Sequence, residues 1–273
     1  MTRRTSLQAP LALLIAVGLF GCPATPGTWA WHLNGDILEI AYGNPDAGWP
    51  QLAAIHLSTS ALRMIPNAES GWGPTIYLAP SLWTDDGASD QYHLGAPVTV
   101  EVSDESSTLV LKTAGNIAGL GFSNTVRFFR PMDSGFLAHI TTTTTGIVDL
   151  ADRPLEAFQP VHAATMRILD NQWDSQAVNI GEQEYPLPLD GQVLALPGIT
   201  AKEFLLVGGD SAWKTNAPNI QVFLDRPLLL NGWANASTDP NDDNIGFWGA
   251  AEEILDQWEF SIFAAPHTDK RSE

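Results

Sequence analysis

Residues 98–146 read VTVEVSDESSTLVLKTAGNIAGLGFSNTVRFFRPMDSGFLAHITTTTTG, and this stretch decides the fold. Apolar and polar residues alternate in it, β-branched and aromatic side chains are frequent, and turns rich in Ser, Asp, Gly and Pro divide it. Each resulting strand offers one apolar face, so a second sheet must cover it. The stretch therefore predicts one sheet of a β-sandwich, with strands at Val98–Val102, Leu109–Thr113, Thr125–Arg130 and Phe136–Thr145.

Shorter segments of the same kind flank this stretch on both sides. No pattern predicts a helix longer than two turns, so we expect an all-β fold, a single large antiparallel β-sandwich. In the closing strand, Trp258, Phe260 and Ile262 alternate with Glu259 and Ser261. The flanking strands are expected at 36–41, 52–57, 61–65, 155–169 with a break at Pro160, 192–196, 203–208, 219–224, 228–230 and the second half of 250–264.

The first 21 residues have the pattern of a lipoprotein signal peptide. Arg3 and Arg4 form a positive start, and Leu11–Phe20 is an apolar run of signal-peptide length. The run ends in Leu-Phe-Gly-Cys, which resembles the lipobox of bacterial lipoproteins and implies acylation at Cys22. An ordinary secretory signal followed by a chance cysteine is the alternative.

Cleavage before Cys22 would divide the chain into three further parts: a lipidated tether at 22–28, a β-sandwich domain at 29–266 and a polar tail at 267–273. The lipid would be the anchor in the cell envelope, because no later segment is apolar enough to span a bilayer. Pro23 follows the cysteine where inner-membrane retention is associated with aspartate. We therefore expect the outer membrane if the host has two.

Composition excludes several classes of partner. The chain has 13 Lys and Arg against 31 Asp and Glu, a formal net charge of −18, so it would be repelled by nucleic acid and anionic headgroups. Its single cysteine cannot form an internal disulfide, so the hydrophobic core must hold the fold. We expect a monomer without a cofactor or a resident metal.

The order of segments resembles the galactose-mutarotase-like supersandwich, in its uncharacterised secreted bacterial branch. An early hairpin leads to Ile76–Trp83, rich in Pro and aromatic residues, and then to Ser123–Arg130 and a threonine-rich strand. Pro160–His162 follows, and a Glu-rich segment precedes the closing strand. The resemblance implies a supersandwich fold and a carbohydrate ligand. Aldose epimerases of this fold carry an Asn-His pair, whereas Val161 precedes His162 here.

That resemblance implies a histidine acid and a glutamate base, which can open a sugar ring near neutral pH. His162 is the candidate acid, and Glu253 is preferred to its neighbour Glu252 as the base. A structural histidine and two solvated surface acids are the alternatives. His139, in the middle of an expected strand, points either to the core or to solvent.

Ten tryptophans suggest a carbohydrate-binding surface, because indole rings stack on the apolar faces of sugars. Trp72 and Trp83 lie in the Gly/Pro-rich segment Gly71–Trp83, which we expect to be irregular, and His93 follows on a loop that could line its rim. Packing in the core is the alternative for both tryptophans.

An acidic segment, Thr238–Gly246, spaces Asp239, Asn241 and Asp243 like the first ligands of a calcium loop. The acid expected at the twelfth place is Ala250, so a solvated acidic loop is the preferred interpretation. The leading functional hypothesis is a membrane-anchored lipoprotein that binds carbohydrate. A carbohydrate-active enzyme, of the aldose epimerase or polysaccharide lyase type, and a purely structural envelope lipoprotein are the alternatives.

Overall fold

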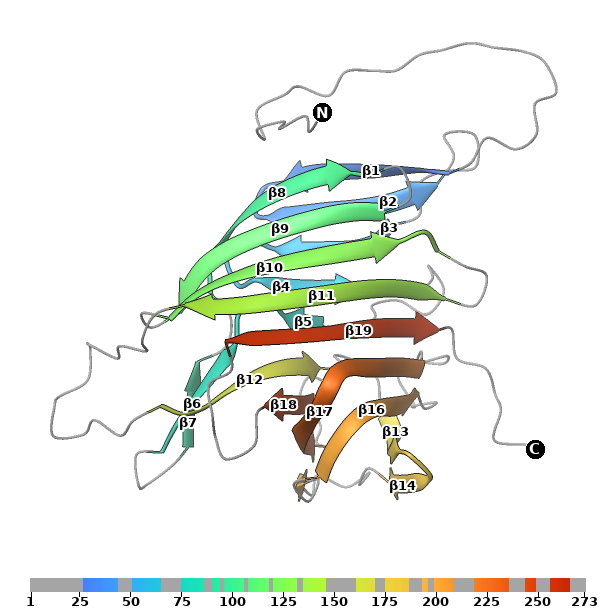
Figure 1. Ribbon diagram of the computed structural model, residues 1–273. Helices are drawn as coiled ribbons and strands as arrows, with labels where there is room; N and C mark the ends of the chain where they lie inside the picture. The colour runs from blue at the N-terminus through green and yellow to red at the C-terminus, as the bar shows by residue number, and fades with distance from the viewer. Residues whose placement is uncertain are drawn as a thin grey trace, which may run out of the picture.

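The computed structural model describes most of the expected domain and no helix in it; all the regular structure is β-strand (Figure 1). The predicted all-β class is therefore confirmed. The described residues are 27–43, 51–64, 75–85, 90–93, 96–105, 108–117, 120–131, 135–145, 161–169, 175–186, 193–195, 199–208, 219–235, 244–248 and 256–265.

One layer, which we call the front sheet, contains the stretch that opened the sequence argument. Its strands pair antiparallel with their neighbours, and in Figure 1 they lie nearest the viewer. In spatial order the front sheet is β8 (Val98–Asp104), β9 (Thr108–Ile117), β10 (Leu120–Phe129), β11 (Phe136–Thr145), β19 (Gln257–Ala265), the first part of β17 (Asn219–Asn235), β16 (Ile199–Gly208), β13 (Ser175–Ile180) and β14 (Gln183–Pro186).

The second layer, the back sheet, is built from the N-terminal strands and later parts of the chain. Strand β12 has β18 on one edge and both β5 and β6 along the other, and β7 pairs with β6. In spatial order it contains β1 (Thr28–Asn34), β2 (Ile37–Gly43), β3 (Gln51–His56), β4 (Ala61–Met64), β5 (Thr75–Tyr77), β12 (Val161–Leu169) and β18 (Asn244–Trp248), with β6 (Ser81–Asp85), β7 (Asp90–His93) and β15 (Val193–Ala195) beside them.

Strand β17 belongs to both sheets. Its residues 219–224 pair with β19 in the front sheet, and residues 229–233 pair with β18 in the back sheet. In the ladder between β17 and β16, the four residues 224–227 lie opposite Lys202 alone, so this ladder is interrupted. Pro227 has no N–H to donate there, and bulges of this kind bend a strand. The sequence predicted a break between two strands at this point, and the bend joins the two layers.

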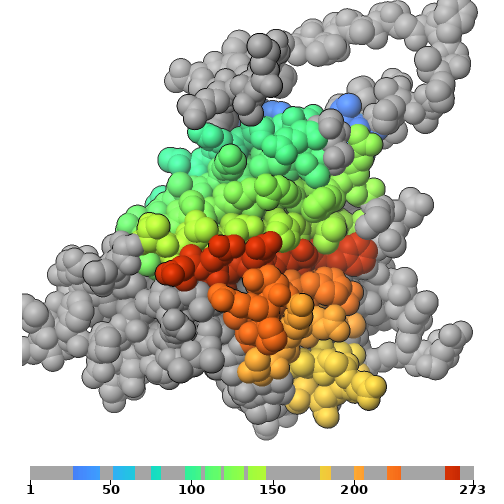
Figure 2. Space-filling model, in the orientation of Figure 1, coloured from blue at the N-terminus to red at the C-terminus, as the bar shows by residue number. Residues whose placement is uncertain are grey.

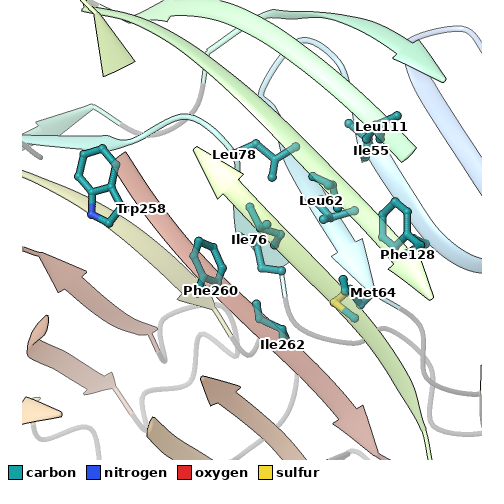
Figure 3. Close-up of a cluster of buried hydrophobic side chains, with 14 of the residues drawn as sticks. Ile55, Leu62, Met64, Ile76, Leu78, Leu111, Phe128, Trp258, Phe260 and Ile262 are labelled. Carbon is teal, nitrogen blue, oxygen red and sulfur yellow. The ribbon is translucent and has the colours of Figure 1, made fainter. Parts of the chain in front are cut away.

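The core lies between the two layers. Phe128, Phe260 and Ile262 of the front sheet are fully buried, as are Leu62 and Ile76 of the back sheet, and all belong to one cluster (Figure 3). Burying a side chain of this size contributes about 1.5–3 kcal/mol. The predicted alternation in the closing strand is confirmed, because its three apolar residues are buried and the two polar residues between them are partly exposed.

A short polar row also crosses the buried side of the front sheet. Asn124 of β10 lies opposite Thr113 of β9 and Thr142 of β11, and all three are buried. Its Nδ2 donates to Thr113 Oγ1 at 2.8 Å, and Thr142 Oγ1 donates to its Oδ1 at 2.6 Å. Buried polar groups need such partners, so the row ties three strands together within an apolar core.

Some boundaries predicted from the sequence were wrong. The segment Gly71–Trp83 was expected to be irregular, but it contains β5 and the start of β6, because Thr75–Tyr77 completes the edge of β12. The expected acidic loop ends early, since β18 begins at Asn244. Pairing supplied by neighbouring strands outweighs weak local patterns in both places.

Two hairpins were missed although the sequence carries their signal. Strand β1 precedes the expected first strand and turns into β2 through Gly35-Asp36, and β13 turns into β14 through Gly181-Glu182. Each loop has two residues with glycine first at φ +61°, the left-handed region that glycine enters without cost.

Candidate functional site

The outward side of the front sheet carries a set of polar side chains that we call the front face. Successive side chains of a strand point to opposite faces, so His139, which lies between the buried Ala138 and Ile140, points outward. Figure 2 shows these strands as one continuous surface, with β19 between β11 and β17.

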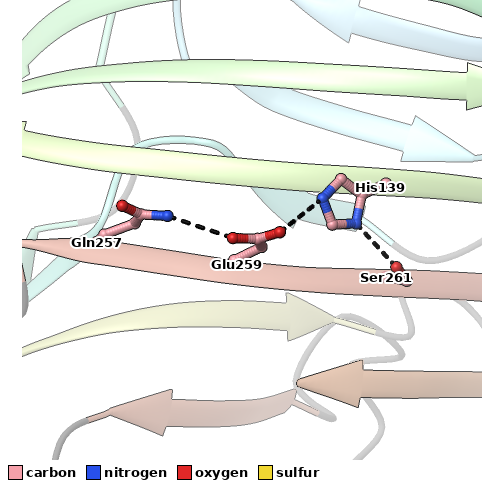
Figure 4. A network of polar contacts seen from close by, with 4 residues as sticks. All are labelled: His139, Gln257, Glu259 and Ser261. Atoms are coloured by element: carbon pink, nitrogen blue, oxygen red, sulfur yellow. Dashed lines mark hydrogen bonds and ion pairs between the residues drawn. The ribbon is translucent and has the colours of Figure 1, made fainter. Parts of the chain in front are cut away.

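The centre of the front face is a chain of contacts between β11 and β19 (Figure 4). Nδ1 of His139 lies 2.9 Å from Oγ of Ser261, and its Nε2 lies 3.2 Å from Oε1 of Glu259. Gln257 Nε2 in turn donates to Glu259 Oε2 at 3.3 Å. The register explains this geometry, because His139 lies directly opposite Ser261 and diagonally opposite Glu259.

The carboxylate fixes which nitrogen of the neutral imidazole carries the proton. An ionised carboxylate can only accept, so Nε2 of His139 must donate to Glu259. Nδ1 is then an acceptor, and the Ser261 hydroxyl donates to it. The side chains of His139 and Glu259 are 25% and 39% exposed, so a ligand on this face can reach both.

A serine, a histidine and a carboxylate in series invite comparison with a nucleophilic triad, but one component is missing. Acyl transfer needs donors for an oxyanion, usually free backbone N–H groups. Ser261 lies in a strand that pairs with β11 on one side and β17 on the other. The described strands therefore leave no free N–H pair beside Ser261, and the arrangement suits binding better than acyl transfer.

The centre belongs to a row of outward residues that crosses five strands, which we call the His139 row. Arg127 of β10 lies opposite His139, Phe223 of β17 lies opposite Ser261, and Glu203 of β16 lies opposite Phe223. Four strand spacings of about 4.8 Å give the row a length of about 19 Å. Phe223 is 39% exposed, an unusual position for so large an apolar side chain.

Hydroxyl groups continue the front face beside the His139 row. Ser123 Oγ and Thr143 Oγ1 lie 2.7 Å apart, and Thr125 lies opposite Thr141 in the neighbouring row. All four are at least partly exposed. Hydroxyls both donate and accept, so this region can match the hydroxyls of a sugar without a fixed direction.

The residues predicted from the sequence are placed only in part. Cys22, Trp72 and Glu253 lie outside the described residues. Trp83, His93 and His162 are described by their backbone alone, and they lie on three neighbouring strands. The prediction that His93 lies on a loop was wrong, because it is the last residue of a strand that pairs with the strand of Trp83.

Those three strands are β6, β7 and β12. Trp83 of β6 pairs with Ala163, the residue after His162, and Leu82 pairs with His93 of β7. The topology therefore brings three predicted site segments together, and a shared pocket for their side chains stays a prediction.

His139 was the residue whose orientation the sequence left open, and the fold directs it outward. Glu259 and Ser261 were recognised as the polar positions of the closing strand. Their meeting with His139 was not predicted, because Ser261 is 122 residues away along the chain.

Among the described residues, no three His, Cys, Asp or Glu side chains gather as they would around a metal ion. The same part of the chain has no helix long and apolar enough to cross a bilayer.

No protein-family model and no curated protein matches this chain. Among solved structures, it is similar to the α-N-acetylgalactosaminidase NagBb from Bifidobacterium bifidum, in a complex with Gal-NHAc-DNJ. The identity is 10% and the TM-score 0.46, over 88% of this chain and 36% of that one. The chain thus spans about a third of that protein's length, and the match says nothing about what this chain binds.

Proposed function

We propose that the protein binds carbohydrate on the front face. The observation that carries the proposal is the combination of an exposed aromatic ring with fixed polar groups beside it. Phe223 offers a flat apolar surface, and the neighbouring Ser261, His139 and Glu259 offer a donor-acceptor set held in place by their mutual contacts. Sugars present the matching pair of surfaces, an apolar CH face and a rim of hydroxyls.

Fixed polar groups matter because ordering side chains on binding costs free energy. Each side chain immobilised at an interface costs about 0.5–1.5 kcal/mol. His139 and Glu259 are already held by Ser261 and Gln257, so less of that cost remains to be met when a ligand binds. This reasoning favours a binding protein over an enzyme for the described residues.

Two finer statements belong to the same proposal. The sandwich is of the galactose-mutarotase-like supersandwich type, which the order of sequence segments supports. The chain is held at the cell envelope by lipid on Cys22, which the Leu-Phe-Gly-Cys pattern supports. A face that binds glycans would then be displayed close to the membrane.

The test is a glycan array followed by titration calorimetry on the strongest hits. Phe223→Ala should weaken binding about tenfold, since loss of an aromatic contact of about 1.4 kcal/mol corresponds to that factor. Leu33→Ala is the matched control, because Leu33 is exposed to a similar extent, 37%, but lies on β1 of the back sheet. Equal affinity of both variants for every hit, or no hit at all, would contradict the proposal.

A further inference from the structure

We propose that the outer edge of β1 pairs with the same edge of a second copy of this chain, so that the protein forms a weak symmetric dimer. The two β1 strands run antiparallel across a two-fold axis, with Trp31 opposite Trp31 of the second copy, and the two back sheets join into one. We expected a monomer from the sequence, and the edge of β1 is the feature that argues for a dimer.

The outer edge of β1 carries backbone groups that no described residue pairs with. Among the described strands, β1 pairs with β2 alone. Asn34 and Ile37 close a two-residue hairpin loop, so the N–H and C=O of Asn34, and of every second residue before it, bond to β2. The N–H and C=O groups of Trp29, Trp31 and Leu33 therefore point to the outer edge, ready to pair with another strand.

The other edge strands are protected, and β1 is not. Proteins blunt exposed edges with charge, with proline or by keeping the strand short. Among the described strands, four others pair on one side only: β8 carries Glu101 and Asp104, β7 carries Asp90, β14 carries Glu184 and Pro186, and β15 has only three residues. Strand β1, TWAWHLN, has seven residues and contains no Asp, Glu, Lys, Arg or Pro.

The sequence of β1 is also complementary to itself. With Trp31 on the two-fold axis, Trp29 of one copy lies opposite Leu33 of the other, and all three residues lie on the core side, opposite buried residues of β2. Apolar side chains thus meet across the axis, and Leu33, which is 37% exposed, gains apolar neighbours. On the outward side Ala30 lies opposite His32, so no like charges face each other directly.

Charge and size make this dimer weak. The net charge of −18 on each copy opposes association, but the repulsion is screened beyond about 8 Å at physiological salt, and β1 itself has no acidic side chain. A contact along one strand about 23 Å long is small beside the roughly 1,600 Å² of a standard interface. We therefore expect a micromolar dissociation constant that falls as salt is raised.

The symmetry also decides how the two front faces are oriented. In an antiparallel pair within one sheet the two-fold axis is perpendicular to the sheet, so both front sheets lie on the same side of the joined back sheets. The two front faces then point in the same direction. Under the proposed function, one dimer binds two sites of the same glycan surface, and avidity strengthens each weak contact. The dimer itself does not depend on that function.

Sedimentation equilibrium of the full chain, purified in detergent, measures the dissociation constant. The parent should dimerise, and more tightly in about 1 M salt than in about 0.01 M. Leu33→Lys should weaken the dimer by about tenfold or more, because a lysine on an edge strand opposes edge pairing. Thr99→Lys is the matched control, since it adds the same charge at an exposed site on β8, and it should dimerise like the parent.

Cross-linking of the chain in lipid vesicles tests the register. The two copies of His32 are diagonal neighbours about 7–8 Å apart, so a short bifunctional thiol reagent should join two copies of His32→Cys. The parent, whose one cysteine is Cys22, gives the background, and Thr99→Cys should not exceed it.

The outcomes separate this inference from the proposed function. A chain that stays monomeric in detergent and is not joined through His32→Cys would overturn the dimer. A dimer that Leu33→Lys leaves intact, or that weakens as salt is raised, would overturn it too, because the contact would then lie elsewhere. A dimer that meets these expectations but binds no glycan leaves this inference standing and overturns the proposed function.

Discussion

The buried polar row offers the sharpest test of how the front sheet is held together. We consider Asn124→Ala, which removes the amide between Thr113 and Thr142. The variant leaves two buried hydroxyls without their partner in the middle of an apolar core. It alters no outward residue of the front face.

The magnitude follows from these contacts. Leaving a buried donor or acceptor unsatisfied costs about 1–3 kcal/mol, and two groups are affected here. We therefore expect Asn124→Ala to lower the free energy of unfolding by about 3 kcal/mol. If Thr113→Val and Thr142→Val are added, no polar group remains to be satisfied. The triple variant should then be about 2 kcal/mol more stable than the sum of the three single changes indicates.

Urea unfolding followed by tryptophan fluorescence measures these differences through the transition midpoint at constant slope. Thr141→Val is the matched control, since Thr141 precedes Thr142 in the same strand but points outward, and it should change stability by no more than about 0.5 kcal/mol. A loss below about 1 kcal/mol for Asn124→Ala, or strict additivity in the triple variant, would refute the reasoning.

Three further expectations concern other parts of the chain. Ser60 is buried at φ +54°, and its Oγ accepts hydrogen bonds from two backbone N–H groups at 3.3 and 3.4 Å, so Ser60→Ala should lower the free energy of unfolding in urea by about 1–3 kcal/mol. Ser60→Gly should lower it less, because glycine adopts the left-handed backbone without strain, and the reverse order of the two variants would contradict this account. Hydrogen bonds from the side chain and backbone of Ser58 hold the pKa of Asp36 below its usual 3.8, so the ionised Asp36 stabilises the folded state above that pH, and this stabilisation is lost as the pH falls through the folded pKa. The difference in the free energy of unfolding between Asp36→Asn and the parent should therefore narrow from about pH 7 to about pH 3, and a constant difference would exclude this linkage. Cys22→Ser should release the protein from the membrane fraction and abolish labelling with a lipid precursor, whereas retention of an unlabelled parent in that fraction would show that the anchor is not lipid.

The sequence determined which class of fold forms and, where alternation is clear as in β19, which side of the strand is buried. Alternation with a period of two is a local property, so Trp258, Phe260 and Ile262 could be assigned to the core without knowing what they face. The same alternation left His139 open, because its strand is mostly threonine and alanine and both faces looked acceptable. The glycine-first loops at Gly35 and Gly181 show that β1 and the β13–β14 hairpin could also have been found locally.

Tertiary structure alone decided which strands are neighbours, and therefore which polar residues form the site. A period-two pattern does not specify which other strand will pair with it, so the pairing of β11 with β19 could not be derived from either segment. The entropy of closing a loop grows only slowly with its length, so a partner 122 residues away costs little more than a nearby one. Packing of the whole core determined that β11 pairs with β19, and this pairing places Ser261 and Glu259 against His139.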